Sequence, residues 1–247
     1  MSFVKNFSDA KRSSRIDAEY FQPKYDEIVD AVKNYKGGWD TLGDLVKMKK
    51  CVEPGSDIYQ ESGIPFVRVS NLSKFEITDN NQQYISEKLY QELIEHQPEQ
   101  NEILLSKDAT PGIAYHLKDK PGRMICSGGI LRLTVKNRRR ISTEYLTLVL
   151  NSTIVQQQIL RDAGGSIINH WRLDQIRNTV VPILSEESQR EIQSNIELAF
   201  NQAKYSRHLL EIAKLGVEMA IEQDEKTAEE WINQNIPLAI ERGEHLT

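Results

Sequence analysis

The sequence contains no apolar stretch of about 18 residues, which is the length that a membrane-spanning helix requires. Its first residues also lack the apolar run of a secretory signal peptide. Cysteine is scarce, because Cys51 and Cys126 are the two present and they lack the spacing of a metal site. Two free thiols in a reducing compartment are the simplest interpretation. These absences predict a cytoplasmic protein without a membrane anchor.

Motifs typical of enzymes that act on nucleotides or DNA are also missing. There is no G-x-x-x-x-G-K-S/T phosphate loop, no G-x-G-x-x-G turn, and no D/N-P-P-Y/F motif of the kind that amino-methyltransferases use to hold a flipped adenine. The five histidines lack paired metal-ligand spacing. Asp224-Glu225-Lys226 resembles the skeleton of a Mg²⁺-dependent nuclease, but no strand surrounds it. We therefore expect no catalytic residue, no metal site and no cofactor on this chain.

Acidic charge dominates overall, with a formal net charge of −5, but the charges are unevenly distributed. Residues 103–180 carry 12 Lys and Arg against 5 Asp and Glu, whereas residues 185–247 carry 6 against 13. Local potential rather than total charge steers a polyanion to a protein surface. The basic segment could therefore face phosphate, although scattered solvated charge would give the same counts.

Residues 185–223 are predicted to form one long helix with a seam of apolar and small residues. Their spacing alternates between four and three, which keeps the seam facing a partner helix along its whole length. Small residues in the seam would let that partner approach closely. The seam residues are Ile192, Ile196, Ala199, Ala203, Ser206, Leu210, Ala213, Val217 and Ala220.

The rest of the chain divides into three further segments. Residues 1–38 are expected to form an N-terminal arm and a helix over 16–35, with Asp17 as its N-cap and Gly37-Gly38 at its end. Residues 39–184 alternate short strand-like runs with turns, and residues 224–247 have the pattern of an acidic helical tail. Within 39–184 we expect strands at 64–69, 102–105, 112–116 and 130–135, helices at 86–95 and 143–161, and an extended piece at 180–184.

Two polar segments at strand ends are candidate contacts with nucleic acid. Arg68, Ser70 and Asn71 follow a strand, and Arg and Asn side chains can each make paired hydrogen bonds to base edges. The alternative is a polar turn in which Asn71 bonds its own backbone. Lys107 and Thr110 belong to a loop that ends in Pro111-Gly112, and they could bind phosphate or simply form a structural turn.

Two more segments carry donors and positive charge. Arg138, Arg139 and Arg140 lie between a strand and a helix, where they could contact phosphate or form a solvated turn. The segment from Gly164 to Arg172 combines glycines with donors, and it could alternatively be a helix cap followed by a packed Trp171. The donors that we expect to face DNA in this last segment are Ser166, Asn169, His170 and Arg172.

Several short pieces together resemble one half of a type I restriction-modification specificity subunit. Each piece alone is weak, but their order and spacing are specific, and they extend from Arg15 to about Gln223. The pieces are RIDAEYFQPKY from Arg15, Trp39 with LGDL from Leu42, GIPFVRVSNL from Gly63, ILLSK from Ile103, Gly164-Gly165 followed by Leu173 and Ile176, VPIL from Val181 and ESQREI from Glu187.

The resemblance implies a mixed α/β target recognition domain with a small β-rich core, followed by a long coiled-coil-like helix. Members of this family usually carry two such domains and two helices, whereas this chain has one of each. Two copies joined through the long helix as a homodimer would restore the usual arrangement. The resemblance further implies double-stranded DNA, an adenine-N6 methyltransferase subunit that binds S-adenosylmethionine, and an ATP-driven restriction subunit as partners.

Two other functions remain open from the sequence alone. A coiled-coil adaptor without a role in DNA binding would show the same helical seam. A nuclease or methyltransferase that acts alone would require motifs that the sequence lacks.

Overall fold

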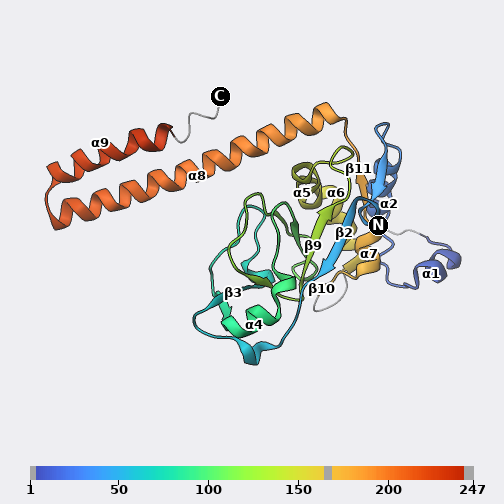
Figure 1. Cartoon of the computed structure of the whole chain (residues 1–247). Helices are drawn as coiled ribbons and strands as arrows, with labels where there is room; N and C mark the ends of the chain where they lie inside the picture. The colour runs from blue at the N-terminus through green and yellow to red at the C-terminus, as the bar shows by residue number, and fades with distance from the viewer. Residues whose placement is uncertain (1–3, 164–168, 242–247) are drawn as a thin grey trace. The chain divides into compact units, whose positions relative to one another are not determined.

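The computed structural model describes residues 4–163 and 169–241, and it divides into a unit of residues 1–189 and a unit of residues 190–247. Short sheets, a set of helices and one long helix make a mixed α/β fold, as predicted (Figure 1). The elements are α1 (Phe7–Ser13), α2 (Pro23–Lys33), β1 (Trp39–Thr41), α3 (Leu42–Leu45), β2 (Val46–Lys50), η1 (Ser56–Ile58), β3 (Ile64–Val67), η2 (Val69–Asn71), β4 (Gln83–Ile85), α4 (Glu87–Glu92), η3 (Ile94–His96), β5 (Ile103–Ser106), β6 (Asp108–Ala109), β7 (Ala114–His116), β8 (Ile125–Cys126), β9 (Ile130–Val135), α5 (Thr143–Asn151), α6 (Thr153–Ala163), β10 (Asn169–His170), α7 (Leu173–Asn178), β11 (Val180–Pro182), α8 (Glu186–Glu222) and α9 (Glu225–Glu241).

The core of the first unit is an antiparallel sheet in the order β2-β9-β5-β7. β5 lies between two partners and all four of its residues are buried, which explains why its sequence is apolar without alternation. β2 pairs with β9 from Val46 opposite Val135 to Lys50 opposite Leu131, and Figure 1 shows the two strands side by side. β2 is an edge strand, and it exposes lysines rather than apolar side chains.

Three smaller sheets join segments that are far apart in the sequence. β3 pairs antiparallel with β4 and parallel with β8, and Phe66, Ile85 and Ile125 are buried together there. β1 pairs with β11, which ties the start of this domain to the residues just before the long helix. β6 pairs with β10, and this pairing is described with the candidate site below.

The expected strands are found at β3, β5, β7, β9 and β11, with ends that differ by a few residues. The helix expected over 143–161 is broken, because Ser152 is extended (φ −78°, ψ 161°) between α5 and α6. The break places Asn151 beside β7. Its side chain accepts from Ala114 N at 3.1 Å and donates to Ala114 O at 2.7 Å.

The helix expected over 16–35 is also shorter than predicted. α2 starts at Pro23, since proline fits the first turn of a helix and disfavours helical conformation in the residue before it. Asp17 is therefore not its N-cap. The Asp17 carboxylate instead accepts hydrogen bonds from Arg15 Nε at 2.6 Å and from Tyr20 N at 3.3 Å.

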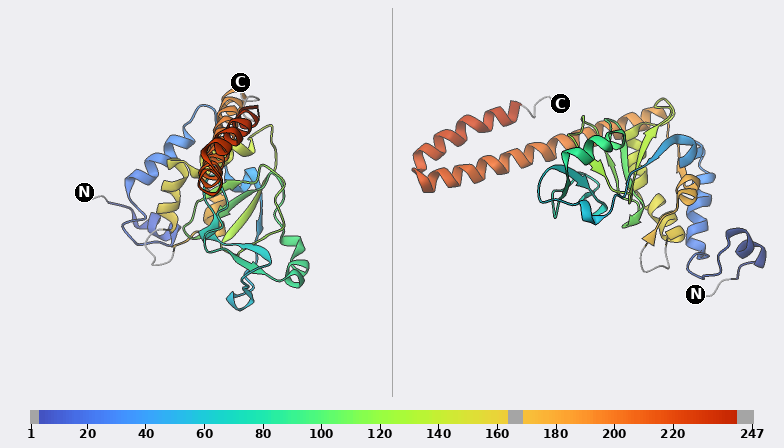
Figure 2. Two further views of the ribbon diagram at one scale, coloured as in Figure 1. Left: turned by 90° about the vertical axis from the view of Figure 1, so that its left-hand side faces the viewer. Right: turned by 60° about the horizontal axis from the view of Figure 1, so that its bottom comes forward.

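The second unit contains two antiparallel helices, most of α8 and all of α9, which lie side by side (Figures 1 and 2). Ile212 and Ala228 are buried at their contact. Gly216 lets α9 approach, because a Cβ at this position would lie 2.4 Å from Ile232 Cδ1. The predicted seam lies on another face of α8. There Leu210 and Val217 stay 56% and 61% exposed.

One buried ion pair crosses the main sheet. Arg132 on β9 is 1% exposed, and its Nε donates to Glu102 Oε2 at 2.6 Å. Glu102 also accepts from Glu99 N at 2.8 Å. Glu99 reaches the same guanidinium at 3.6 Å, but its side chain is 78% exposed. Two carboxylates thus face one arginine in very different dielectric surroundings.

Glu102→Gln is expected to lower the free energy of unfolding by about 3 kcal/mol, because it leaves a buried guanidinium without its buried counter-charge. Glu99→Gln is the matched control and should cost less than about 1 kcal/mol, because exposed pairs are screened by water. Urea unfolding of the two variants measures both values. Equal losses in the two variants would contradict this account of the sheet.

Candidate nucleic-acid interface

The pairing of β6 with β10 joins two of the segments that the sequence singled out. Asn169 lies opposite Ala109, and His170 lies opposite Asp108. The loop that contains Lys107 and Thr110 and the segment that ends at Arg172 therefore lie next to each other, although about sixty residues separate them in the chain. Thr110 and His170 are exposed, and Asn169 is partly exposed.

Trp171 anchors this pair of strands to the core. Its side chain is 1% exposed, and its backbone N–H donates to Lys107 O at 2.8 Å. Lys107 N donates in turn to Gly129 O at 2.9 Å, next to the start of β9. The structural interpretation of Trp171 as a packed residue is therefore confirmed, while its neighbour His170 points its ring to solvent with 64% exposure.

Asp108 connects the two strands through its side chain. Its Oδ1 lies 2.9 Å from His170 Nδ1, and its Oδ2 is paired with Lys107 Nζ. Partial burial by itself raises the pKa of Asp108, but the hydrogen bonds from Lys107 and His170 outweigh burial and leave this pKa below its usual value. The carboxylate therefore holds Lys107 and His170 in fixed positions at the surface.

The loop after β6 is held in an uncommon conformation. Ala109 has φ +58°, a left-handed conformation that residues with a side chain rarely adopt. Ser106 Oγ donates to Thr110 O at 2.6 Å and accepts from Ile113 N at 2.8 Å, so the turn is braced by a fully buried hydroxyl. The Thr110 side chain consequently faces outwards on a rigid loop.

The segment after β3 also reaches this site. A Cβ on Gly129 would lie 2.9 Å from Val69 Cγ2 and 3.6 Å from Asp108 Cβ, so η2 and β6 meet at this glycine. Ser70 is exposed on η2, directly after Val69. Three of the four candidate segments thus converge on one surface of the first unit.

The structure corrects the predicted DNA contact of Asn71. It is fully buried, its Oδ1 accepts from Arg68 N at 3.1 Å, and its Nδ2 donates to Thr78 O at 3.2 Å and Asn80 O at 2.9 Å. These bonds use both amide hydrogens, and the side chain is fully buried, so Asn71 shapes the turn and cannot reach a base edge. Arg68 is partly buried, donates to Asn81 O, and lies 5.8 Å from the centre of the Tyr59 ring.

Arg138, Arg139 and Arg140 do not join this surface. They follow the far end of β9, and the six residues of this strand span roughly 20 Å. Arg140 is paired with Asp40 on β1 at 2.9 Å. Arg172 donates to Asp174 at 3.1 and 3.2 Å, which restrains its guanidinium next to α7. Ser166 lies outside the described residues.

The sequence interpretation missed Asp108 as the residue that organises this site. The available signal was an acid inside a basic segment, directly between Lys107 and the turn. It also placed Arg138–Arg140 with the other donors, because adjacency in the sequence says nothing about which end of a strand a loop occupies.

Most of this chain matches a known protein family. The sequence profile of the type I restriction modification DNA specificity domain matches residues 36–207, which is more than half of the chain. The chain belongs to this family. The interface described above therefore lies within a DNA specificity domain, and DNA recognition rather than catalysis is the role of this family.

One solved structure shows the same fold, and two more are similar over most of this chain. The S subunit of a type I restriction-modification system from M. genitalium is 15% identical with a TM-score of 0.54, and the match covers 76% of this chain and 46% of that one. A structure from a study of type I R-M complex assembly (15% identity, TM-score 0.47) and the HsdS subunit from Thermoanaerobacter tengcongensis (14%, 0.43) match 91% and 95% of this chain and 53% and 54% of theirs. This specificity domain chain spans about half the length of these structures. No curated protein matches it.

Neither a metal-binding group of side chains nor a membrane-spanning helix is found in the described residues of the specificity domain chain. Within residues 4–163 and 169–241, no three His, Cys, Asp or Glu side chains are grouped in a way that could hold a metal ion. None of the helices in the described part of the chain is both long enough and apolar enough to cross a membrane.

Asp108→Asn is expected to flatten the loss of stability in acid. Because the folded pKa of Asp108 is lowered, its contribution is present above the unfolded pKa of about 3.9 and is lost as the pH falls through the folded pKa. Urea unfolding between about pH 6 and pH 3 should show a steeper decline for the wild type, by up to about 1 kcal/mol, since the group is partly exposed. Parallel profiles would contradict the proposed bonds to Lys107 and His170.

Proposed function

We propose that this chain is the DNA-reading subunit of a type I restriction-modification enzyme and reads one half-site of a split target. The observation that carries the proposal is the pairing of β6 with β10 within a DNA specificity domain. It gathers a cation, a hydroxyl, an amide and an imidazole on one exposed surface. These groups are Lys107, Thr110, Asn169 and His170.

In this proposal, contacts to phosphates position the domain and contacts to bases read the sequence. Lys107, Arg172 and the exposed Arg138 and Arg139 contact phosphates and set the position of the domain on the duplex. Asn169 and His170, with Ser70 and Thr110 beside them, contact base edges, because amide, imidazole and hydroxyl groups can discriminate donors from acceptors there. Arg68 lies in the same segment as Ser70, and its bond to Asn81 O restrains this segment.

The long helix acts as the spacer between half-sites. The 37 residues of α8 make a rod of about 55 Å, which corresponds to between one and two turns of duplex DNA. Ala199, Ala203, Leu210, Ala213 and Val217 are exposed on its seam, and Ile192 and Ile196 are partly exposed. A second copy of the chain, packed antiparallel against this seam, would place two recognition domains at a fixed distance with two-fold symmetry.

In this proposal, other subunits catalyse methylation and restriction. An adenine-N6 methyltransferase subunit that binds S-adenosylmethionine would methylate the half-sites, and an ATP-driven restriction subunit would complete the enzyme. Support comes from the family match, since a specificity domain without catalytic groups must direct a partner that has them.

Sequencing of methylated DNA from cells that express this chain with its methyltransferase tests the function. A split motif whose methylation requires this chain is expected, and a palindromic motif would indicate a homodimer. An asymmetric motif would replace the homodimer with two different readers. Methylation that is independent of this chain would overturn the proposal.

Replacing Asn169 and His170 together with alanine is expected to relax sequence selectivity. Each lost base contact should cost about 1–3 kcal/mol on the target duplex and much less on a scrambled duplex. Fluorescence anisotropy with both duplexes, on the chain with its methyltransferase, measures the ratio of the two affinities. Asn34→Ala, at an exposed position after α2, is the amide control and should leave this ratio unchanged.

A double substitution of Ala203 and Leu210 by glutamate is expected to prevent dimerisation, because it places charge in the middle of the apolar seam. Sedimentation at increasing protein concentration measures the association. Lys204→Glu is the control, since one residue corresponds to a rotation of about 100° and places this side chain beside the seam rather than in it. A dimer that survives the double substitution would show that the seam is not the interface.

A further inference from the structure

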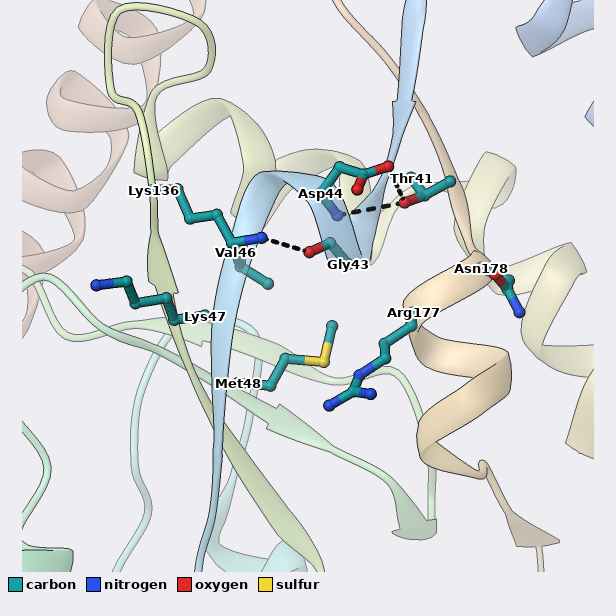
Figure 3. A pocket seen from close by; sticks show the side chains of 9 residues that line it. All are labelled: Thr41, Gly43, Asp44, Val46, Lys47, Met48, Lys136, Arg177 and Asn178. Carbon is teal, nitrogen blue, oxygen red and sulfur yellow. Dashed lines mark hydrogen bonds between the residues drawn. The ribbon is translucent and has the colours of Figure 1, made fainter.

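A pocket of about 560 Å³ lies on the first unit between the edge strand β2 and helix α7, outside the β6–β10 surface (Figure 3). Of its lining residues, Lys136 lies just before the run of Arg138, Arg139 and Arg140, and the others lie outside the candidate segments from the sequence. The residues that line it are Thr41, Gly43, Asp44, Val46, Lys47, Met48, Lys136, Arg177 and Asn178. Its lining carries three cationic side chains against one carboxylate.

Gly43 brings two of the cations together. Lys136 Nζ donates to Gly43 O at 2.7 Å, so the end of β9 is fixed to α3. On its other side, a Cβ at Gly43 would lie 3.1 Å from both Arg177 Cβ and Arg177 O. The missing side chain therefore allows α7 to pack closely against α3, and Arg177 extends past Gly43 into the pocket.

The Arg177 guanidinium has no neutralising neighbour. Within the described residues it makes no hydrogen bond and no ion pair, whereas Arg132, Arg140, Arg161 and Arg172 are all paired with carboxylates. Figure 3 shows it facing the Met48 side chain across the pocket. The one carboxylate of the lining, Asp44, accepts instead from Thr41 Oγ1 at 2.6 Å.

The pocket is close to the proposed DNA-reading surface along the chain. α7 starts at Leu173, directly after His170, Trp171 and Arg172, and Arg177 is four residues further. Four residues of helix correspond to a rise of about 6 Å. Lys136 follows the far end of β9, whose six residues span roughly 20 Å from the start of the strand beside β6. The phosphates of one DNA strand follow each other at an axial spacing of about 3.4 Å, so a duplex that contacts both sites spans about six nucleotides between them.

We propose that this pocket binds a backbone phosphate of the duplex that the β6–β10 surface reads, with Arg177 as the main ligand and Lys136 as the second cation of the lining. The inference rests on the proposed function. A guanidinium matches phosphate oxygens with two parallel hydrogen bonds, and phosphate contacts fix the position of a domain without reading sequence. A phosphate is favoured over a protein carboxylate because the lining carries three cationic side chains against one carboxylate, and because α7, which contributes Arg177, follows β10 directly in the chain.

Arg177→Gln tests this site, because glutamine keeps a polar side chain and removes the charge. The probe is a labelled duplex of arbitrary sequence, and its affinity for the full chain is measured over a series of salt concentrations. Loss of one phosphate contact should reduce the slope of log K against log salt by about 0.9. It should weaken target and scrambled duplexes by the same factor, so the selectivity that Asn169 and His170 provide is retained.

Two control variants accompany the test, and thermal unfolding verifies that all variants are folded. Arg177→Lys keeps the charge and should retain most of the slope, since counterion release depends on charge. Lys88→Gln removes a charge at an exposed position of α4 and should leave the slope unchanged.

The possible failures are distinguishable. If the chain binds duplex DNA and Arg177→Gln leaves the slope unchanged, the phosphate site is wrong and the proposed function stands. If Arg177→Gln instead weakens binding of the methyltransferase subunit without changing the slope, the pocket holds a protein carboxylate and the inference is overturned. If the wild type shows no salt-dependent affinity for DNA, with or without its methyltransferase, both proposals fail.

Discussion

The candidate interface depends on the short antiparallel contact between β6 and β10. Only two residue pairs form it, but Trp171 is buried directly after it and donates its backbone N–H to Lys107. Burial of one large aromatic side chain thus fixes the position of two polar segments that flank it. The partly buried Asp108 carboxylate then holds the side chains of Lys107 and His170 in position. A recognition surface built in this way loses little conformational entropy on binding.

Electrostatics in this domain are more local than a count of charges indicates. Many of the arginines in the basic segment are neutralised within the fold, since Arg132 pairs with Glu102, Arg140 with Asp40 and Arg161 with Asp162. The excess of positive charge over residues 103–180 therefore overstates the field that reaches solvent. What remains is concentrated at a few side chains, of which Arg177 in its pocket has the clearest geometry.

The two units differ in how they bury apolar residues and in what they expose. The first buries short strands on all sides and presents loops, as expected for a domain whose contacts must differ in detail from one target to another. The second is a helical hairpin in which α9 covers one face of α8, and the predicted seam remains on another face. A single helix can therefore bind its own chain and still offer an apolar stripe to a second one.

The sequence by itself determined the elements whose pattern is long or strongly apolar. α8, β5 and β9 were predictable because their periodicity or continuous apolar character reflects burial along the element itself. The family resemblance could also be drawn from the order of short motifs. α5 and α6 were predicted as one helix, because the break at Ser152 depends on the bond between Asn151 and β7, which the local sequence does not contain.

Only the tertiary structure decided which polar residues belong together. From the sequence, Asn71 could contact a base or bond the backbone of a turn, and the structure shows three hydrogen bonds of its side chain inside a turn. Lys107 and His170 meet through β6 and β10, while Arg138 and Arg139 lie at the opposite end of β9. The physical reason is that a polar side chain carries no periodic signal, so its role is set by the strand ends and partners that folding places around it.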